Sequence, residues 1–154
     1  EGGIRVPAII RWPGRIPRAR TRLQTMSMDW LPTLLRLVGA MPTESAFDGA
    51  DLSYDMLVPA KGVPKMRALY WRTQDMAAVR YGRWKYVREE GREYLFDLDA
   101  DPGERANQRL RQPGMLGDLR GRYEAWEPTM LPIPADARRP RTRLRQEFEA
   151  LDRR

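Results

Sequence analysis

Four acidic residues lie close together in the second half of the chain: Asp97, Asp99, Asp101 and Glu104. Carboxylates at alternate positions are typical of loops that bind calcium, but such a loop also needs glycine at its sixth position and glutamate at its twelfth. Counted from the first aspartate, those positions hold Pro102 and Gln108. We therefore interpret residues 101–104, Asp-Pro-Gly-Glu, as a turn that leaves a strand, and we expect no metal site in this chain.

Trp71 and Arg72 are the candidate binding residues of the chain, because they stand together at the end of an expected strand. A planar guanidinium beside an aromatic ring can hold an anionic group such as a sulfate or a carboxylate. The alternative is a tryptophan of the core followed by an arginine of the surface.

Lys85 and Arg88 flank Tyr86 in another expected strand. Basic residues among aromatic ones can bind single-stranded nucleic acid. Alternation along a strand, however, turns the aromatic ring toward a core. We expect core packing here, and nucleic acid is not the partner that we expect.

Cysteine and histidine are both absent from the 154 residues. The chain therefore contains no disulfide, no thiol nucleophile, and no histidine that could act as a base or a metal ligand. A Ser-His-Asp triad is impossible within it. We expect no catalytic residue in this chain.

Arginine dominates the basic residues, with 25 Arg against 3 Lys, and the formal net charge is +7. A basic chain can bind nucleic acid or another polyanion, but a GC-rich genome also produces an arginine bias. The arginines are spread along the chain, which favours the second interpretation. The basic run at 138–145 lies among acidic residues, so we interpret it as part of a solvated or docked helix, with an anion-binding arm as the alternative.

Hydrophobic periodicity and turn residues predict the secondary structure. Strands are expected at 6–12, 68–71, 77–80, 84–88 and 94–98, and helices at 29–38, 116–126 and 142–153. A short helical turn is expected at 52–57 and a proline-rich linker at 128–141. No apolar run approaches the roughly 20 residues that cross a membrane, so we expect no membrane span.

The helix expected at 29–38 has clear start and stop signals. Asp29 can cap its first turn, and Pro32 falls within that turn, where a missing N–H costs little. Gly39 is a natural stop. One face carries four apolar residues at helical spacing, which we expect to be buried: Leu31, Leu34, Leu35 and Val38.

The strands between residues 68 and 98 are expected to form an antiparallel meander. Gly82 and Gly91 supply the positive φ that short hairpins need. Trp84 and Tyr86 should point to one face, which an apolar row on the last strand is expected to match: Tyr94, Phe96 and Leu98. A helix should cover that face through residues at helical spacing: Leu116, Leu119, Tyr123 and Trp126.

Six segments of the chain resemble blocks of the sulfatases, in the family's order and at plausible spacings. They lie at 1–7 (EGGIRVP), 28–35 (MDWLPTLL), 47–52 (FDGADL), 68–72 (ALYWR), 78–86 (AVRYGRWKY) and 94–104 (YLFDLDADPGE). Each block is weak alone, but together they are specific. The resemblance extends over residues 1 to about 126.

This resemblance implies an alkaline-phosphatase-like α/β fold and the hydrolysis of sulfate esters. Sulfatases of the arylsulfatase type use a formylglycine, made from the Cys or Ser of a C/S-x-P-x-R motif, and a divalent metal, usually calcium. The family's sulfate-binding lysine would precede Glu1, and the metal carboxylates would lie earlier still. Ser27, Ser45 and Ser53 do not begin such a motif. The resemblance therefore implies a piece of a sulfatase that lacks the catalytic and metal-binding residues.

We therefore expect the C-terminal part of a sulfatase, α/β in the whole protein and α+β within this chain. Residues 1–58 would end the catalytic domain. Residues 67–127 would form a C-terminal subdomain, a sheet of about four strands covered by a helix. Residues 128–154 would form a linker and a terminal amphipathic helix.

The resemblance also implies that the subdomain packs against the rest of the catalytic domain and shapes the rim of the substrate cleft, with Trp71 and Arg72 at that rim. Alone, the chain should be inactive and only marginally stable. The alternative is a stand-alone basic module that binds a polyanion or a protein partner. The sulfate ester and the cellular compartment stay open.

Overall fold

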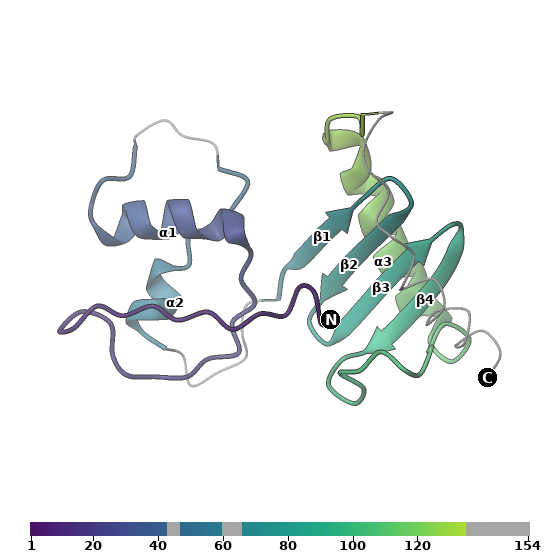
Figure 1. Ribbon diagram of the computed structural model, residues 1–154, viewed down its shortest axis with the longest axis horizontal. Coiled ribbons are helices and arrows are strands. Elements are labelled where there is room, and N and C mark those ends of the chain that lie inside the picture. Colours follow the sequence, from purple (N-terminus) through teal and green to yellow (C-terminus); the bar gives the residue numbers. More distant parts are fainter. Residues whose placement is uncertain (43–46, 60–65, 135–154) are drawn as a thin grey trace. The chain divides into compact units, whose positions relative to one another are not determined.

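The computed structural model describes residues 1–42, 47–59 and 66–134 (Figure 1). The chain divides into two compact units, which we call the helical unit (Val6–Lys65) and the sheet unit (Glu1–Arg5 with Met66–Arg154). The described part of the helical unit contains a 3-10 turn and two helices: η1 (Ser27–Asp29), α1 (Trp30–Leu37) and α2 (Ser53–Leu57). The described part of the sheet unit contains four strands, one helix and a second 3-10 turn: β1 (Ala68–Arg72), β2 (Met76–Tyr81), β3 (Trp84–Glu89), β4 (Arg92–Asp97), α3 (Pro113–Trp126) and η2 (Glu127–Thr129).

The four strands form an antiparallel meander in the order β1-β2-β3-β4. Two-residue turns join β2 to β3 and β3 to β4, so that Tyr81 pairs with Trp84 and Glu89 with Arg92. The turn glycines Gly82 and Gly91 have φ of 58° and 81°, which residues with a side chain rarely adopt. The predicted sheet, with its turns, is confirmed.

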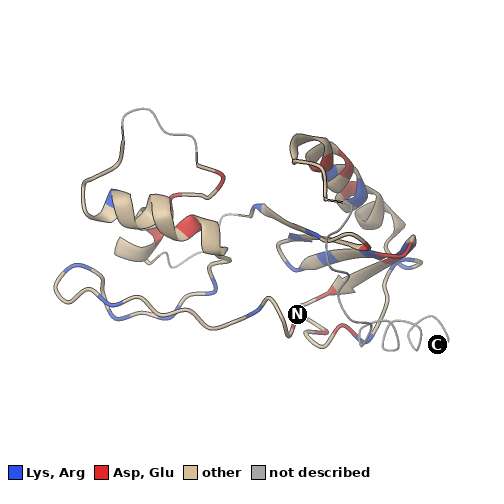
Figure 2. Cartoon of the chain, turned by 45° about the horizontal axis from the view of Figure 1, so that its top comes forward, with Lys and Arg blue, Asp and Glu red and all other residues tan. Residues whose placement is uncertain are grey.

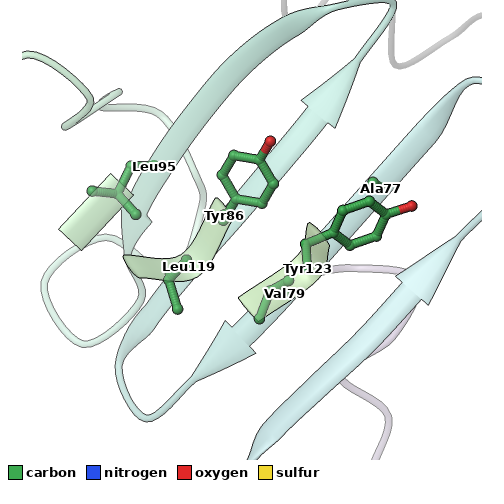
Figure 3. Close-up of a cluster of buried hydrophobic side chains, with 6 residues drawn as sticks. All are labelled: Ala77, Val79, Tyr86, Leu95, Leu119 and Tyr123. Carbon is green, nitrogen blue, oxygen red and sulfur yellow. The ribbon is translucent and has the colours of Figure 1, made fainter. Parts of the chain in front are cut away.

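α3 lies across one face of the sheet and closes the main core (Figure 3). Leu119 and Tyr123 of the helix are almost completely buried. The strands contribute four more buried side chains to this cluster: Ala77, Val79, Tyr86 and Leu95. At its edge the ring of Tyr70 stacks on Trp126, with centroids 4.8 Å apart. The predicted covering helix is therefore confirmed, and Pro113 near its start supplies the fixed φ that favours a first turn.

The apolar row of β4 faces away from α3, contrary to the prediction. Tyr94 pairs with Val87 and Phe96 with Lys85, so they share the second face of the sheet, whereas Leu95 pairs with Tyr86 on the helix side. The two-residue turn explains the difference, because pairing residue 89 with 92 places even-numbered residues of β3 opposite odd-numbered residues of β4. Both faces are buried, and a second apolar cluster forms there: Val87, Tyr94, Phe96 and Leu98.

In the helical unit, polar side chains attach α1 to the segment that precedes α2. The buried Asp29 accepts hydrogen bonds from the backbone N–H of Met26 (2.6 Å) and of Ala50 (2.9 Å). The hydroxyl of Thr33, also buried, accepts one from the N–H of Leu52 (3.0 Å). The chain passes so close at Gly49 that a Cβ there would lie 2.0 Å from the carbonyl oxygen of residue 28. Any residue with a side chain in place of Gly49 would push the backbone at position 49 away from residue 28.

These bonds overturn two expectations about α1. Asp29 stands at the N-cap position, but its side chain makes no bond to the first turn of the helix. The buried side of the helix carries Pro32, Thr33 and Leu37, because the hydrogen bonds turn that side toward residues 50–52. Three residues of the predicted buried face are exposed instead: Leu31 (58%), Leu34 (46%) and Val38 (64%).

Residues 6–12 do not form the buried strand that was expected. Val6 is 72% and Ile9 92% exposed, and the segment has no strand hydrogen bonds within the described residues. A strand exists only when a neighbouring strand satisfies its N–H and C=O groups, and no described segment pairs with this one. Half of the linker expected at 128–141, and all of the helix expected at 142–153, lie outside the described residues.

Replacing Leu119 by alanine should lower the free energy of unfolding by about 2–5 kcal/mol, because it removes a fully buried side chain and leaves a cavity. Urea denaturation followed by circular dichroism measures this. Leu110→Ala is the matched control, since Leu110 is 85% exposed and should change stability by no more than about 0.5 kcal/mol. Equal effects of the two substitutions would contradict the packing described here.

Candidate functional site

The two predicted binding residues, Trp71 and Arg72, lie in β1 at one edge of the sheet. Neighbouring residues of a strand point to opposite faces. Trp71 pairs with Ala78 on the second face, whereas Arg72 pairs with Ala77, which belongs to the core under α3. The Arg72 guanidinium donates a hydrogen bond to the carbonyl oxygen of residue 131. The two side chains therefore do not converge on one anionic group, and a role for either of them at a cleft rim stays a prediction.

A cluster of charged side chains occupies the second face of the sheet, and we call it the charge cluster: Glu1, Arg80, Lys85 and Glu104. The ammonium of Lys85 lies 2.6 Å from Oε1 of Glu104 and 3.5 Å from Oε1 of Glu1. Nη1 of Arg80 lies 3.1 Å from Oε2 of Glu1. All four side chains are largely buried, with exposed fractions between 5% and 18%.

Sheet register explains why the cluster needs both carboxylates. Arg80 and Lys85 are directly paired across β2 and β3, and like charges placed opposite each other destabilise a sheet. Burial disfavours the ionised form of Glu104, but the hydrogen bond and the charge of Lys85 outweigh it and lower the pKa of that carboxyl below its usual value. The side chains of the cluster are two cations and two anions, so little net charge remains to hold a sulfate.

The charge cluster therefore has a positioning role rather than a chemical one. It attaches residues 1–5 to a sheet that begins more than 60 residues later in the sequence, and the backbone nitrogen of Glu1 also contacts Glu104. Alternation along β3 predicts that Lys85 points to the face opposite Tyr86, but it predicts no partner for the lysine. A lysine between Trp84 and Tyr86 in a strand is the signal that could have pointed to a buried ion pair.

A second polar group lies on the other face, where it fixes α3 to the sheet. Arg120 donates two hydrogen bonds to the carboxylate of Glu93, at 2.7 and 2.5 Å, and the hydroxyl of Tyr86 donates a third at 2.9 Å. The hydrogen bonds from Arg120 hold the pKa of Glu93 below its usual value, although burial acts in the opposite direction. Burial, together with the Glu93 carboxylate, raises the pKa of Tyr86. Tyr86 is completely buried, so it presents no ring to a nucleic-acid base.

A polar hollow of about 260 Å³ lies where the turns after β1 and β3 meet the end of α3. The guanidinium of Arg88 covers the ring of Tyr123, 4.9 Å from its centroid, and lies 3.7 Å from the Glu127 carboxylate. The Tyr123 hydroxyl donates to the same carboxylate at 2.6 Å, and burial raises its pKa to about 12. Arg88 and Tyr123 are thus engaged with each other and with Glu127, which leaves neither of them as a ready acid, base or nucleophile.

Three of the four acidic residues that resemble a calcium loop have other partners: Asp97, Asp101 and Glu104. Asp97 binds the guanidinium of Arg83, and Asp101 accepts hydrogen bonds from two backbone N–H groups of its own loop. Glu104 belongs to the charge cluster. Across the part of the chain that the structure describes, no group of three His, Cys, Asp or Glu residues could hold a metal ion. Within the same residues, every helix is too short or too polar to span a lipid bilayer.

Comparison with known proteins identifies the family. No family model matches the chain, but human arylsulfatase A is 35% identical over 127 residues, which cover 77% of this chain and 25% of the relative. Mouse arylsulfatase G is 47% identical over 90 residues, 57% of this chain and 17% of the relative. The chain belongs to the sulfatase family. It spans about a quarter of the length of human arylsulfatase A.

The structural comparison gives the same fold. A candidate sulfatase from Bacteroides fragilis superimposes with a TM-score of 0.59 over 75% of this chain and 27% of that protein, at 24% identity. The likeness confirms the expected fold class, part of an alkaline-phosphatase-like α/β architecture, with the four-stranded sheet and α3 as its α+β portion. The resemblance of this chain to the sulfatases is confirmed by the match to arylsulfatase A.

Replacing Lys85 by methionine should lower the free energy of unfolding by about 3–5 kcal/mol, because it leaves buried carboxylates without a counter-charge. Chemical denaturation at pH 7 measures this. Arg122→Met is the control, since its ion pair with Asp118 lies on the surface and should contribute less than about 1 kcal/mol. Adding Glu104→Gln to Lys85→Met should restore part of the lost stability; a further loss would contradict the buried pair.

Stability should fall as the pH drops below about 5. The pKa values of Glu93, Asp97 and Glu104 are all lower in the folded chain than their ordinary values of 4.5, 3.8 and 4.5. The folded state therefore binds fewer protons than the unfolded state in this range, so its extra stability is complete above pH 5 and is lost as the pH falls. Thermal denaturation between pH 3 and 7 measures the slope. Arg120→Gln should flatten it, and an unchanged slope in that variant would contradict the role given to Arg120.

Proposed function

We propose that this chain is the C-terminal part of a sulfuric ester hydrolase, and that it packs against the catalytic domain and shapes the rim of the substrate cleft. The observation that carries the proposal is the match to arylsulfatase A over 77% of the chain but only 25% of the relative. Sulfate esters are then the substrates of the whole protein, and the chain contributes to their binding without performing the reaction.

The chain's own residues do not fit the cofactors that sulfatases use. A formylglycine needs a Cys or Ser in a C/S-x-P-x-R motif, and this chain has no Cys and no such motif after its three serines. Attack on a sulfate ester also requires positive charge concentrated on the sulfate oxygens, and the charge cluster is neutralised by its own carboxylates. The formylglycine and a divalent metal, calcium by analogy with the family, would belong to the rest of the protein.

The exposed apolar residues of the helical unit support the proposed packing. Leu31, Leu34 and Val38 form a continuous stripe on α1, at i, i+3 and i+7, and all three are about half exposed or more. Ile9 and Val6 are exposed in the segment that lacks a strand partner. Large apolar patches on a protein usually mark a surface that another protein part covers. The rest of the catalytic domain is the part that we propose covers them, and it would lie in the portion of arylsulfatase A that this chain does not match.

Trp71 and Arg72 remain our proposed rim residues, each by itself. Trp71 is partly exposed at the edge of the sheet, where an aromatic ring can pack on a substrate. Arg72 can contribute charge, although its guanidinium already contacts residue 131. In the assembled protein, alanine at either position should raise KM for a sulfate ester more than it changes kcat, since neither residue touches the reacting atoms.

The chain alone should not hydrolyse p-nitrophenyl sulfate, whereas co-expression with the upstream part of the same reading frame should restore hydrolysis. The paired substitution Leu31→Asp and Leu34→Asp should prevent both association and activity, because it places charge in the proposed contact. Leu110→Asp, at an exposed position of the sheet unit, is the control and should leave both unchanged. Hydrolysis by the isolated chain would overturn the proposal, as would an upstream frame that contains no C/S-x-P-x-R motif.

A further inference from the structure

Residues 2–28 of the chain combine strong positive charge with an absence of carboxylates. No Asp or Glu occurs between Glu1 and Asp29, and six arginines lie in this interval: Arg5, Arg11, Arg15, Arg18, Arg20 and Arg22. In Figure 2 the long loop that precedes α1 accordingly carries basic positions and no acidic ones. We call residues 11–22 the arginine loop. Its composition differs from that of the sheet unit, where basic and acidic residues are mixed.

The guanidinium groups of the arginine loop are available to a partner. All five of its arginines are exposed, and within the described residues none of them forms an ion pair; Arg15 alone has a contact, over the ring of Trp12 at 5.2 Å. The sheet unit uses its arginines differently, because Arg83, Arg120 and Arg122 each bind a carboxylate. Among the described residues, the arginine loop therefore groups five exposed arginines without an ion pair within 12 positions of the chain.

The loop also holds its arginines close together. The arginine loop begins with a tight turn. The N–H of Ile16 donates a hydrogen bond to the carbonyl of Trp12 (2.9 Å) and closes this turn, in which Gly14 has a φ of 76°. Arg18, Arg20 and Arg22 follow with one residue between neighbours, so their adjacent Cα atoms are at most about 7 Å apart. Because these side chains start so close together along the chain, one linear polyanion can contact all three of them.

We propose that the arginine loop binds a linear sulfated polysaccharide, the kind of substrate chain that carries several sulfate esters. This inference rests on the proposed function, since it names a substrate class for the same protein. Guanidinium groups bind sulfate oxygens through paired hydrogen bonds. The loop offers a nucleic acid no stacking platform, because residues 13–29 include no aromatic residue and the ring of Trp12 is covered by Arg15. The loop thus fits a polymer with anionic groups and no bases.

Binding of heparin to the 154-residue chain tests the proposal by isothermal titration calorimetry at 0.15 M NaCl and across a salt series. The double variant Arg18→Gln and Arg20→Gln should weaken binding by about five-fold or more and reduce the salt dependence, because it removes two contacts to anionic groups. Arg105→Gln with Arg111→Gln is the matched control. These two arginines are also exposed. This control variant has the same net charge as the Arg18/Arg20 variant, but it lies outside the arginine loop and should change affinity less than about two-fold.

Three further probes decide which partner the loop prefers. Heparin with its sulfates removed, which keeps the carboxylates, should bind far more weakly. A 20-base-pair DNA duplex and vesicles of phosphatidylserine and phosphatidylcholine should bind more weakly than heparin at equal salt. Equal losses in the two double variants, undiminished binding of desulfated heparin, or tighter binding of DNA or vesicles would each overturn the proposal.

The two proposals can fail separately. Heparin binding is measured on this chain alone, whereas sulfate ester hydrolysis is measured on the assembled protein. If hydrolysis is restored and heparin does not bind, the family function stands and the substrate is not recognised by the arginine loop. If heparin binds and no assembly restores hydrolysis, the loop is a polyanion-binding surface, but its role in delivering a substrate is wrong.

Discussion

The two-residue turns at Gly82 and Gly91 are the constraint on which the rest of the sheet unit depends. They set the register of β2, β3 and β4, and so they decide which side chains share a face. Val79, Tyr86 and Leu95 fall on one face and form, with Leu119 of α3, a dry core. Arg80 and Lys85 fall on the other face as neighbours. A shift of one residue would exchange the two faces and bury the cations under the helix.

Given that register, the charge cluster follows from electrostatics. Two adjacent cations on a largely buried face need counter-charges, and the chain supplies them from Glu1 and from Glu104 after β4. The same interaction that neutralises the face therefore attaches a distant segment to it. On the helix side, Glu93 in the same way attaches α3 to the sheet, because its carboxylate accepts a hydrogen bond from Arg120. Because these carboxylates are engaged, they are not available to form a metal site.

The helical unit differs from the sheet unit because apolar and basic side chains of the helical unit lack partners among the described residues. Its polar groups are well satisfied inside, where Asp29 and Thr33 bind the backbone around residue 50. Its apolar stripe on α1 and its arginine loop, in contrast, face solvent. An unpaired stripe and an unpaired group of cations have different chemical partners, an apolar protein surface in the first case and a polyanion in the second. Both observations agree with a chain that functions as part of a larger protein.

The sequence by itself determined the four strands of the sheet, their turns, α3 and the sulfatase family, because these depend on local periodicity, on turn glycines and on short motifs. It also excluded cysteine and histidine chemistry outright. Only the tertiary structure decided which faces are buried: the row of Tyr94 turned to the second face, Leu31 and Leu34 of α1 turned outward, and residues 6–12 lacked a strand neighbour. It alone brought Glu1 and Glu104 to Lys85. Local spacing specifies which side chains share a face of an element, but what that face packs against depends on contacts between residues far apart in the chain.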